Sequence, residues 1–281
     1  MLFALVAGVL PALPAQEARY RPPPAYVSGG KADQAEGARL LQDFRASGIA
    51  GPYWLSFELR VMPRKGDERT VSGQLFGSRN ESGPITRLTL PGSGGLATEQ
   101  RWLIQSGPQP AASSWSGATG VTRTLAAADS FQPIAGTDLS LFDLQMPFLY
   151  WPEFVYEGVA KVRGRPAHSF VLYPPAELAA ARPDLTGVRV LLDTQFQALV
   201  QAELLGPKGE TAKSFTVLDL KKVGEQWVPK SIDLRNHRTR DKTRFTVTAA
   251  ALNLALPPET FTPGGLAAEA PAVPAAAIER F

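Results

Sequence analysis

Hydrophobic and polar residues alternate along much of this chain, and a period of two predicts β-strands. The clearest case is the range 53–62, in which Ser56, Glu58 and Arg60 share one face of a strand. The opposite face is apolar and carries Tyr53, Leu55, Phe57, Leu59 and Val61. Such a face belongs against a hydrophobic core, while the other face meets water.

Further ranges of the same character follow, separated by short turns, most of which contain Gly or Pro. We expect strands at 70–78, 85–90, 101–105, 121–125, 154–162, 167–173, 188–193, 198–205, 213–221, 227–236 and 242–252. Strands joined by short turns run antiparallel, and a sheet of roughly ten or more strands curls or closes. The pattern therefore predicts a mainly β protein with one large antiparallel sheet.

One range before the first strand has helical spacing instead. At 31–47 apolar residues recur about every three positions and charged residues fill the other side, as in an amphipathic helix. We expect this helix to pack on the concave side of the sheet through Leu41 and Phe44. An insertion at 174–184 predicts a single helical turn, and 107–120 shows no clear pattern.

The segment Gly136–Glu153 is strongly apolar but does not alternate, and Pro147 and Pro152 would interrupt a β-ladder. An apolar segment of this size is buried under another element or covers one. We expect it to be a flap over an apolar cavity walled by the apolar face of 53–61 with Leu41 and Phe44. An ordinary filled core would bury the same side chains, and the sequence fits both interpretations. The flap residues are Leu139, Phe142, Met146, Phe148, Leu149 and Trp151.

The composition supplies ample apolar material for a core. Of the 281 residues 44% are hydrophobic, the net charge is +3, and there is no cysteine. The lack of cysteine excludes disulfides and thiol catalysis. A net charge this small gives no reason to expect nucleic acid as a partner. We expect one domain, at 31–266.

Both ends of the chain differ in composition from this domain. Residues 1–15 form an uncharged apolar run closed by small residues and Pro, as in a secretory signal peptide. The run is shorter than the roughly 20 residues of a membrane span. We expect removal of 1–15, a flexible arm at 16–30, and a disordered Ala/Pro-rich tail at 267–281. The protein would then be exported without an anchor.

Candidate catalytic residues are few. His168 and His237 are the only histidines, and neither has a further ligand at metal-binding spacing. Ser93 lacks the full Gly-x-Ser-x-Gly context of a nucleophile elbow. Asp138 and Asp143 could form an acid–base pair, but capping of a turn or helix is the more common role at such places. We therefore expect no enzyme activity, no metal and no cofactor.

The range Leu234–Arg244 places five basic side chains around one predicted turn. It contains no aromatic residue that could stack on bases, which argues against nucleic acid. A solvated hairpin is one interpretation, and contact with anionic lipid headgroups or an acidic partner is the other.

Several short motifs occur in order between Gly136 and Leu266. They are Gly-Thr-Asp-Leu-Ser at 136–140, Tyr-Glu-Gly at 156–158, Gly-Arg-Pro at 164–166, Lys-Gly-Glu at 208–210, Trp-Val-Pro-Lys at 227–230 and Leu-Pro-Pro-Glu-Thr-Phe at 256–261. In this order and spacing the chain resembles the LolA-like family of outer-membrane lipoprotein-sorting proteins. The resemblance covers somewhat less than half of the chain.

This resemblance implies a strongly curved open antiparallel sheet, or half-barrel, with a few helices covering its concave apolar face. It also implies a periplasmic carrier or chaperone that shelters the acyl chains of lipoproteins or other lipids. The alternative is an envelope-stress or regulatory sensor of the same fold that binds lipid or protein segments without transporting them. We expect a monomer with transient contacts to membrane proteins or anionic headgroups. The family has no catalytic residues to transfer.

Overall fold

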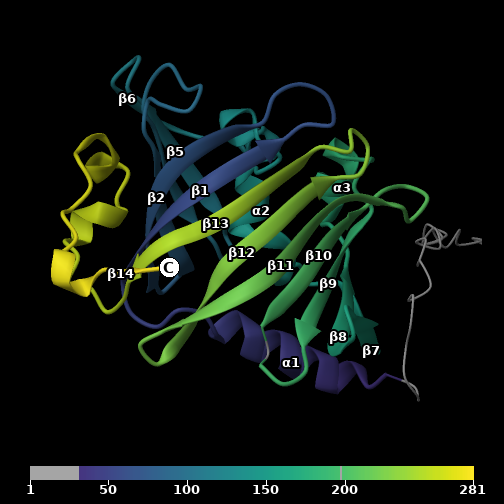
Figure 1. The fold of residues 1–281 in the computed structure, drawn as a ribbon. Coiled ribbons are helices and arrows are strands. Elements are labelled where there is room, and N and C mark those ends of the chain that lie inside the picture. Colours follow the sequence, from purple (N-terminus) through teal and green to yellow (C-terminus); the bar gives the residue numbers. More distant parts are fainter. Residues whose placement is uncertain (1–31, 197) are drawn as a thin grey trace, which may run out of the picture.

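One antiparallel sheet contains all the strands of the described residues, and it stays open between two edge strands (Figure 1). The structure is a computed structural model that describes residues 32–196 and 198–281. The expected signal peptide at 1–15 and flexible arm at 16–30 lie outside the described residues. The open, curved, mainly β sheet with few helices confirms the predicted fold class.

The strands agree closely with the alternation of the sequence. In the first half they are β1 (Tyr53–Met62), β2 (Arg69–Asn80), β3 (Gly83–Leu90), β4 (Gln100–Gln105), β5 (Ala111–Ser116) and β6 (Val121–Thr124). In the second half they are β7 (Phe154–Val162), β8 (Arg165–Leu172), β9 (Gly187–Asp193), β10 (Leu199–Leu205), β11 (Thr211–Val223), β12 (Gln226–Asn236), β13 (Lys242–Ala251) and β14 (Glu279–Arg280). The prediction omits β5, whose sequence Ala-Ala-Ser-Ser-Trp-Ser has little apolar character.

The strand order places the first and the last long strands side by side in the middle of the sheet. The order is β6-β5-β4-β3-β2-β1-β13-β12-β11-β10-β9-β8-β7. β1 pairs with β13 from Trp54 opposite Ala251 to Met62 opposite Lys242. The two edge strands, β6 and β7, therefore follow one another along the chain. The segment between them must pass from one edge of the open sheet to the other.

The two faces of β1 differ in burial, as the alternation of apolar and polar residues predicts. Phe57 and Leu59 are buried in the main hydrophobic core, whereas Glu58 and Arg60 on the other face are exposed. The Phe57 ring stacks on Phe245 of β13, with 4.7 Å between the ring centroids. Burial of each such side chain stabilises the fold by about 1.5–3 kcal/mol. The concave face is therefore the apolar one.

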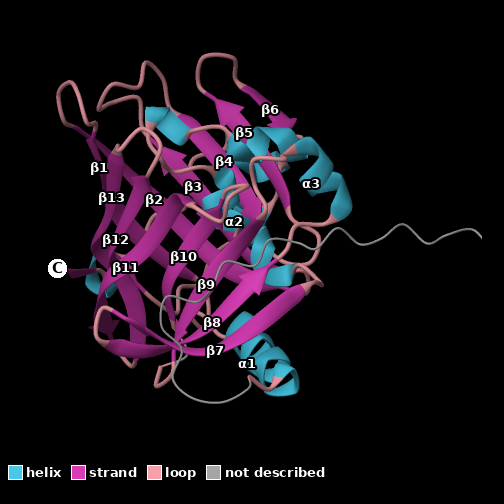
Figure 2. Cartoon of the chain, turned by 90° about the vertical axis from the view of Figure 1, so that its right-hand side faces the viewer, coloured by secondary structure: helices cyan, strands magenta, loops and turns pink. Residues whose placement is uncertain are grey.

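Helix α1 (Gln34–Ala46) lies across one end of the curved sheet, below β8 to β11 in Figure 1 and beside β7 in Figure 2. Leu41 is fully buried in the main core and Phe44 packs against that core, as the sequence predicts. Gly37 allows a close approach to β7, since a Cβ at this position would lie 2.4 Å from the Cβ of Tyr156.

The chain after β13 is ordered on the convex face of the sheet, which corrects the predicted disordered tail at 267–281. Arg87 of β3 and Arg101 of β4 are buried there and donate hydrogen bonds to backbone carbonyls. Arg87 donates to Gly265 at 3.1 Å, and Arg101 donates to Ala267 at 2.7 Å. Backbone carbonyls carry no sequence signal, so composition could not reveal this anchoring. The elements of this segment are η4 (Pro258–Phe261), η5 (Gly264–Ala267), η6 (Ala275–Ala277) and β14.

Replacing Arg101 with Met is expected to loosen the C-terminal segment. The change leaves buried carbonyls without a donor and removes the 2.6 Å ion pair with Glu99, which costs about 1–3 kcal/mol of unfolding free energy. Urea unfolding measures this loss, and hydrogen exchange at 264–268 should become faster. Arg123→Met on β6 is the control, because Arg123 is exposed. Equal stability and exchange in both variants would refute the anchoring role.

Candidate functional site

The segment that joins the two edge strands crosses the concave face of the sheet and fills it. Its helices are η1 (Ala127–Phe131), η2 (Ile134–Gly136), α2 (Leu141–Gln145) and η3 (Pro147–Tyr150). In Figure 1 α2 lies behind β12 and β13. Within this segment we call residues 136–153 the flap. Its predicted side chains are buried at Leu139, Phe142, Phe148, Leu149 and Trp151 and partly buried at Met146.

The structure brings the two predicted sets of site residues together. The apolar face of β1 and the flap belong to one hydrophobic core, which also includes Leu41 of α1. Tyr53 and Phe44 are partly buried and pack against this core. Val61 is buried as well. Contact of these residues with a ligand stays a prediction.

Aromatic side chains form a continuous path from the surface into this core. Phe131 of η1, which is partly exposed, stacks on the buried Phe142 with 4.5 Å between ring centroids. The ring centroid of Phe142 in turn lies 5.7 Å from that of Phe148 and 6.3 Å from that of Trp151. Stacked and tilted contacts at these separations are favourable geometries for aromatic pairs.

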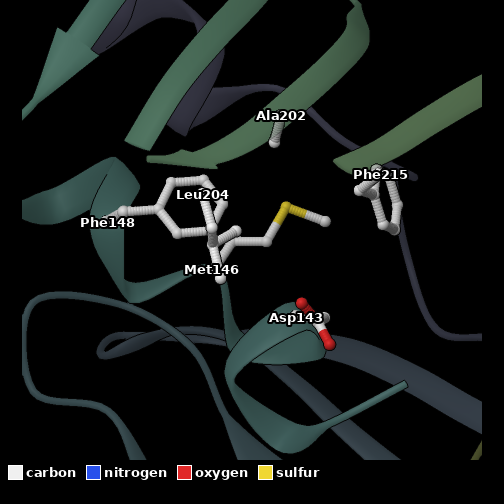
Figure 3. A pocket seen from close by; sticks show the side chains of 6 residues that line it. All are labelled: Asp143, Met146, Phe148, Ala202, Leu204 and Phe215. Atoms are coloured by element: carbon white, nitrogen blue, oxygen red, sulfur yellow. The ribbon is translucent and has the colours of Figure 1, made fainter. Parts of the chain in front are cut away.

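A small void lies between the flap and the sheet. A void of about 10 Å³ is lined by Asp143, Met146, Phe148, Ala202, Leu204 and Phe215 (Figure 3). In Figure 3 the Met146 side chain extends between the rings of Phe148 and Phe215. Such a void holds about one water molecule, whereas pockets for small ligands measure about 300–1,000 Å³. Around this void the side chains of the flap and of the sheet are therefore closely packed.

Hydrogen bonds from the sheet hold the flap at both aspartates. Asp143 accepts hydrogen bonds from the N–H and hydroxyl of Ser140 at 2.8 and 2.6 Å, which forms a capping box at the start of α2. Lys213 of β11 donates to the same carboxylate. Thr243 of β13 accepts from the N–H of Asp138 at 2.9 Å and donates to its carboxylate at 3.0 Å. Both aspartates therefore anchor the flap, in agreement with the structural role expected of them.

The flap reverses direction between α2 and η3. Met146 has a φ of 45°, in the left-handed region that residues other than glycine rarely adopt, and Pro147 follows it. Just before this reversal, Gln145 donates a hydrogen bond to the carbonyl of Ala111 in β5 at 3.0 Å. Phe142, before the reversal, and Phe148, after it, belong to the same core.

A second space, a groove of about 220 Å³, is lined in part by Phe131, Phe142 and Leu204. It lies between η1 and α2 on one side and β10, β11 and β12 on the other, and α3 (Ala176–Ala181) ends beside it. Leu204 lines both the groove and the small void, so the two spaces adjoin. The charged residues that line the groove are Asp138, Arg182, Asp184, Lys213 and Arg238.

The lining of this groove comes from widely separated parts of the chain, so no single sequence motif marks it. One signal pointed toward it: the basic range 234–244 contributes Asn236 and Arg238 to the lining. Most of that range forms the end of β12, a turn and the start of β13.

The two histidines serve as local hydrogen-bond partners. His168 Nδ1 lies 2.8 Å from the hydroxyl of Tyr156, and His237 Nε2 lies 2.9 Å from that of Ser214. Burial lowers the pKa of His168. Within residues 32–196 and 198–281, no group of three or more His, Cys, Asp or Glu side chains is arranged to hold a metal ion. No helix in the same ranges has the length and apolar character needed to cross a membrane.

Comparison with solved structures identifies the fold. A domain assigned to the outer membrane lipoprotein-sorting proteins, from Vibrio parahaemolyticus, has a TM-score of 0.74 and 16% identity, covering 84% of this chain and 100% of that one. A DUF1329 family protein from Desulfovibrio piger has a TM-score of 0.71 and 12% identity, covering 83% and 98%. A LolA superfamily protein from Nitrosomonas europaea has a TM-score of 0.60 and 11% identity, covering 80% and 96%. The protein therefore has a LolA-like fold, as the sequence predicts.

The sequence also matches a family model. Residues 92–268 match the model of a family described as "Uncharacterized protein". This match spans more than half of the chain, so the chain belongs to that family. Comparison with curated proteins found no match.

Replacing Asp138 with Asn tests how the flap is anchored. Burial raises the pKa of Asp138 above its ordinary value of 3.8, so the folded state takes up a proton at higher pH than the unfolded state does. The native protein should therefore gain stability from this group as the pH falls through its raised pKa toward 3.8. Asp138→Asn removes the buried charge but keeps an acceptor for Thr243. We expect it to be the more stable protein at pH 7, with an advantage that shrinks toward pH 4.

Urea unfolding at a series of pH values measures this difference. Asp43→Asn is the control, because Asp43 is exposed on α1. A stability difference between Asp138→Asn and the native protein that stays constant with pH would contradict a raised pKa of Asp138.

Proposed function

We propose that this protein is a periplasmic carrier or chaperone that shelters the acyl chains of lipoproteins or other lipids. The acyl chain would lie on the concave face of the sheet, in the space that the flap side chains now fill. The observation that carries this proposal is the filling itself. The flap is not a strand of the sheet, yet it buries five of its six predicted side chains against the concave face.

The physical basis of the proposal is an exchange of one apolar filling for another. An acyl chain gains about 0.8 kcal/mol for each methylene removed from water. The empty concave face would be a large exposed apolar surface and a site of aggregation. A flap that covers this face without cargo and withdraws when cargo binds avoids that exposure.

The flap has features that fit such a movement. It is held by a small number of hydrogen bonds, among them those from Thr243 and Lys213 to Asp138 and Asp143. Met146, which lines the void, has an unbranched, flexible side chain, and methionine adapts readily to changed surroundings. The sheet itself is held by continuous ladders of backbone hydrogen bonds. Movement of the flap therefore leaves the framework intact.

Hydrogen exchange with and without a synthetic triacylated lipopeptide tests whether the flap moves. We expect faster exchange at 138–153 when the lipopeptide is bound, because its acyl chains displace the flap. Exchange in β3 (Gly83–Leu90) should stay unchanged and serves as the internal control. Native mass spectrometry would confirm binding separately. Identical exchange of the flap in a protein that demonstrably holds the lipopeptide would remove the flap from the mechanism.

Replacing Ala202 with Leu tests whether the interior beside Met146 receives the acyl chain. Ala202 is buried and lines the void, so the larger side chain occupies the space the ligand needs. We expect lipopeptide binding to weaken about tenfold or more, with a stability loss of about 1–3 kcal/mol from overpacking.

The matched control is Ala167→Leu on β8. Ala167 is also fully buried, but it does not line the void. It should show a comparable stability loss and normal binding. Normal binding by both variants would place the ligand elsewhere. Tight binding without transfer of lipid to acceptor vesicles would favour the sensing role over carriage.

A further inference from the structure

We infer that the groove of about 220 Å³ is the entrance for a single-chain amphiphile with an anionic head group, and that the head group binds Arg182 and Arg238. This inference rests on the proposed function, because the chain of the amphiphile would continue into the interior beneath the flap.

The carboxylate of Asp184 already lies beside Arg182 and Arg238, where we expect the head group. Asp184 accepts two hydrogen bonds from Arg182, at 2.8 and 2.9 Å, and lies 3.5 Å from a guanidinium nitrogen of Arg238. The hydrogen bonds from Arg182 lower the pKa of Asp184 to about 2. Two guanidinium groups therefore converge on one carboxylate, and this geometry also suits a phosphate or a carboxylate head group.

This arrangement is open to exchange. The side chains of Arg182 and Asp184 are 35% and 39% exposed, and that of Arg238 is 53% exposed. Ion pairs at such positions contribute little to stability, because water solvates the separated charges well. An incoming anion can replace Asp184 at the arginines at low cost, and the released carboxylate can turn toward water.

The apolar part of the amphiphile has a continuous path from this point. The guanidinium of Arg182 lies 4.1 Å from the ring centroid of Phe131, and Phe131 stacks on Phe142. Phe142 also lines the groove and belongs to the core beneath the flap. Leu204 lines both the groove and the void beside Met146. A chain whose head is held at the rim therefore points toward the interior.

The size of the groove agrees with an entrance rather than a complete binding site. Its volume of about 220 Å³ is below the 300–1,000 Å³ or so typical of pockets that enclose a ligand. It can take a head group and the first part of a chain. The ion pair between Lys213 of the groove and Asp143 of the void stands between the two spaces.

Binding of matched probes to the full-length protein tests this inference. The probes are dodecyl phosphate, which is anionic, monolauroylglycerol, which has a similar chain and a neutral head, and inorganic phosphate. Titration calorimetry below the critical micelle concentrations gives the affinities. The variants are the double substitution Arg182→Gln and Arg238→Gln, the single substitution Asp184→Asn, and the control Arg235→Gln. Arg235 is an exposed residue of β12 that does not line the groove.

We expect the double variant to bind dodecyl phosphate about tenfold more weakly and monolauroylglycerol as the native protein does. Asp184→Asn should bind dodecyl phosphate more tightly, because it removes the competing carboxylate. Arg235→Gln should change neither affinity, which excludes a general effect of net charge. Unfolding curves verify that each variant is folded.

Three results would overturn the inference. The first is an unchanged affinity of the double variant for dodecyl phosphate while both amphiphiles bind the native protein. The second is equal weakening by Arg235→Gln. The third is binding of inorganic phosphate as tight as that of dodecyl phosphate, which would make the groove a site for free anions. If neither amphiphile binds the native protein, the proposed function fails, and this inference fails with it.

Discussion

The pairing of β1 with β13 determines the rest of this structure. It joins two strands that lie far apart in the chain and puts them in the middle of the sheet, from Trp54 opposite Ala251 to Met62 opposite Lys242. The strands between them in sequence then spread outward in two directions. As a result β6 and β7, which are consecutive, become the two edges. Their connection has to cross the open side, so the topology itself delivers the flap to the concave face.

The segment that crosses the concave face covers apolar surface that an open curved sheet would otherwise expose to water. A concave apolar face cannot be left in water, and here α1 covers part of it with Leu41 while the flap covers more with Phe142, Phe148 and Trp151. The polar contacts of the flap with the sheet are few and involve β5, β11 and β13, whereas its apolar contacts are extensive. Among the described residues, no ladder of backbone hydrogen bonds joins the flap to the sheet. The fold therefore combines a hydrogen-bonded framework with a cover that is held mainly by side-chain packing.

The sequence predicts most of the framework, because alternation is strong wherever one face is buried and the other is wet. β1 and β7 agree with the predicted ranges at both ends, and Leu41 lies in the core as expected. Most of the flap residues are buried too, which a flap over a cavity and an ordinary filled core both predict. β5 is missed because Ser and Ala carry no clear alternation. The ordered C-terminal segment is missed because Arg101 binds its backbone rather than its side chains. Whether the interior is filled depends on how single side chains such as Met146 pack. The periodicity of the sequence does not predict such packing.

The position of β14 has a consequence for how the protein behaves among other proteins. β12 pairs with β13 only from Ser231 opposite Thr246 to Arg235 opposite Lys242, and beyond this point the two strands separate. β14 pairs with β13 in the gap, with Arg280 opposite Ala249 and Glu279 opposite Ala250. Without it, a run of small apolar residues would offer unpaired hydrogen-bonding groups in the middle of the sheet, which is a template for strand addition by another chain. Glu279 and Arg280 thus occupy part of β13 that another chain could otherwise pair with.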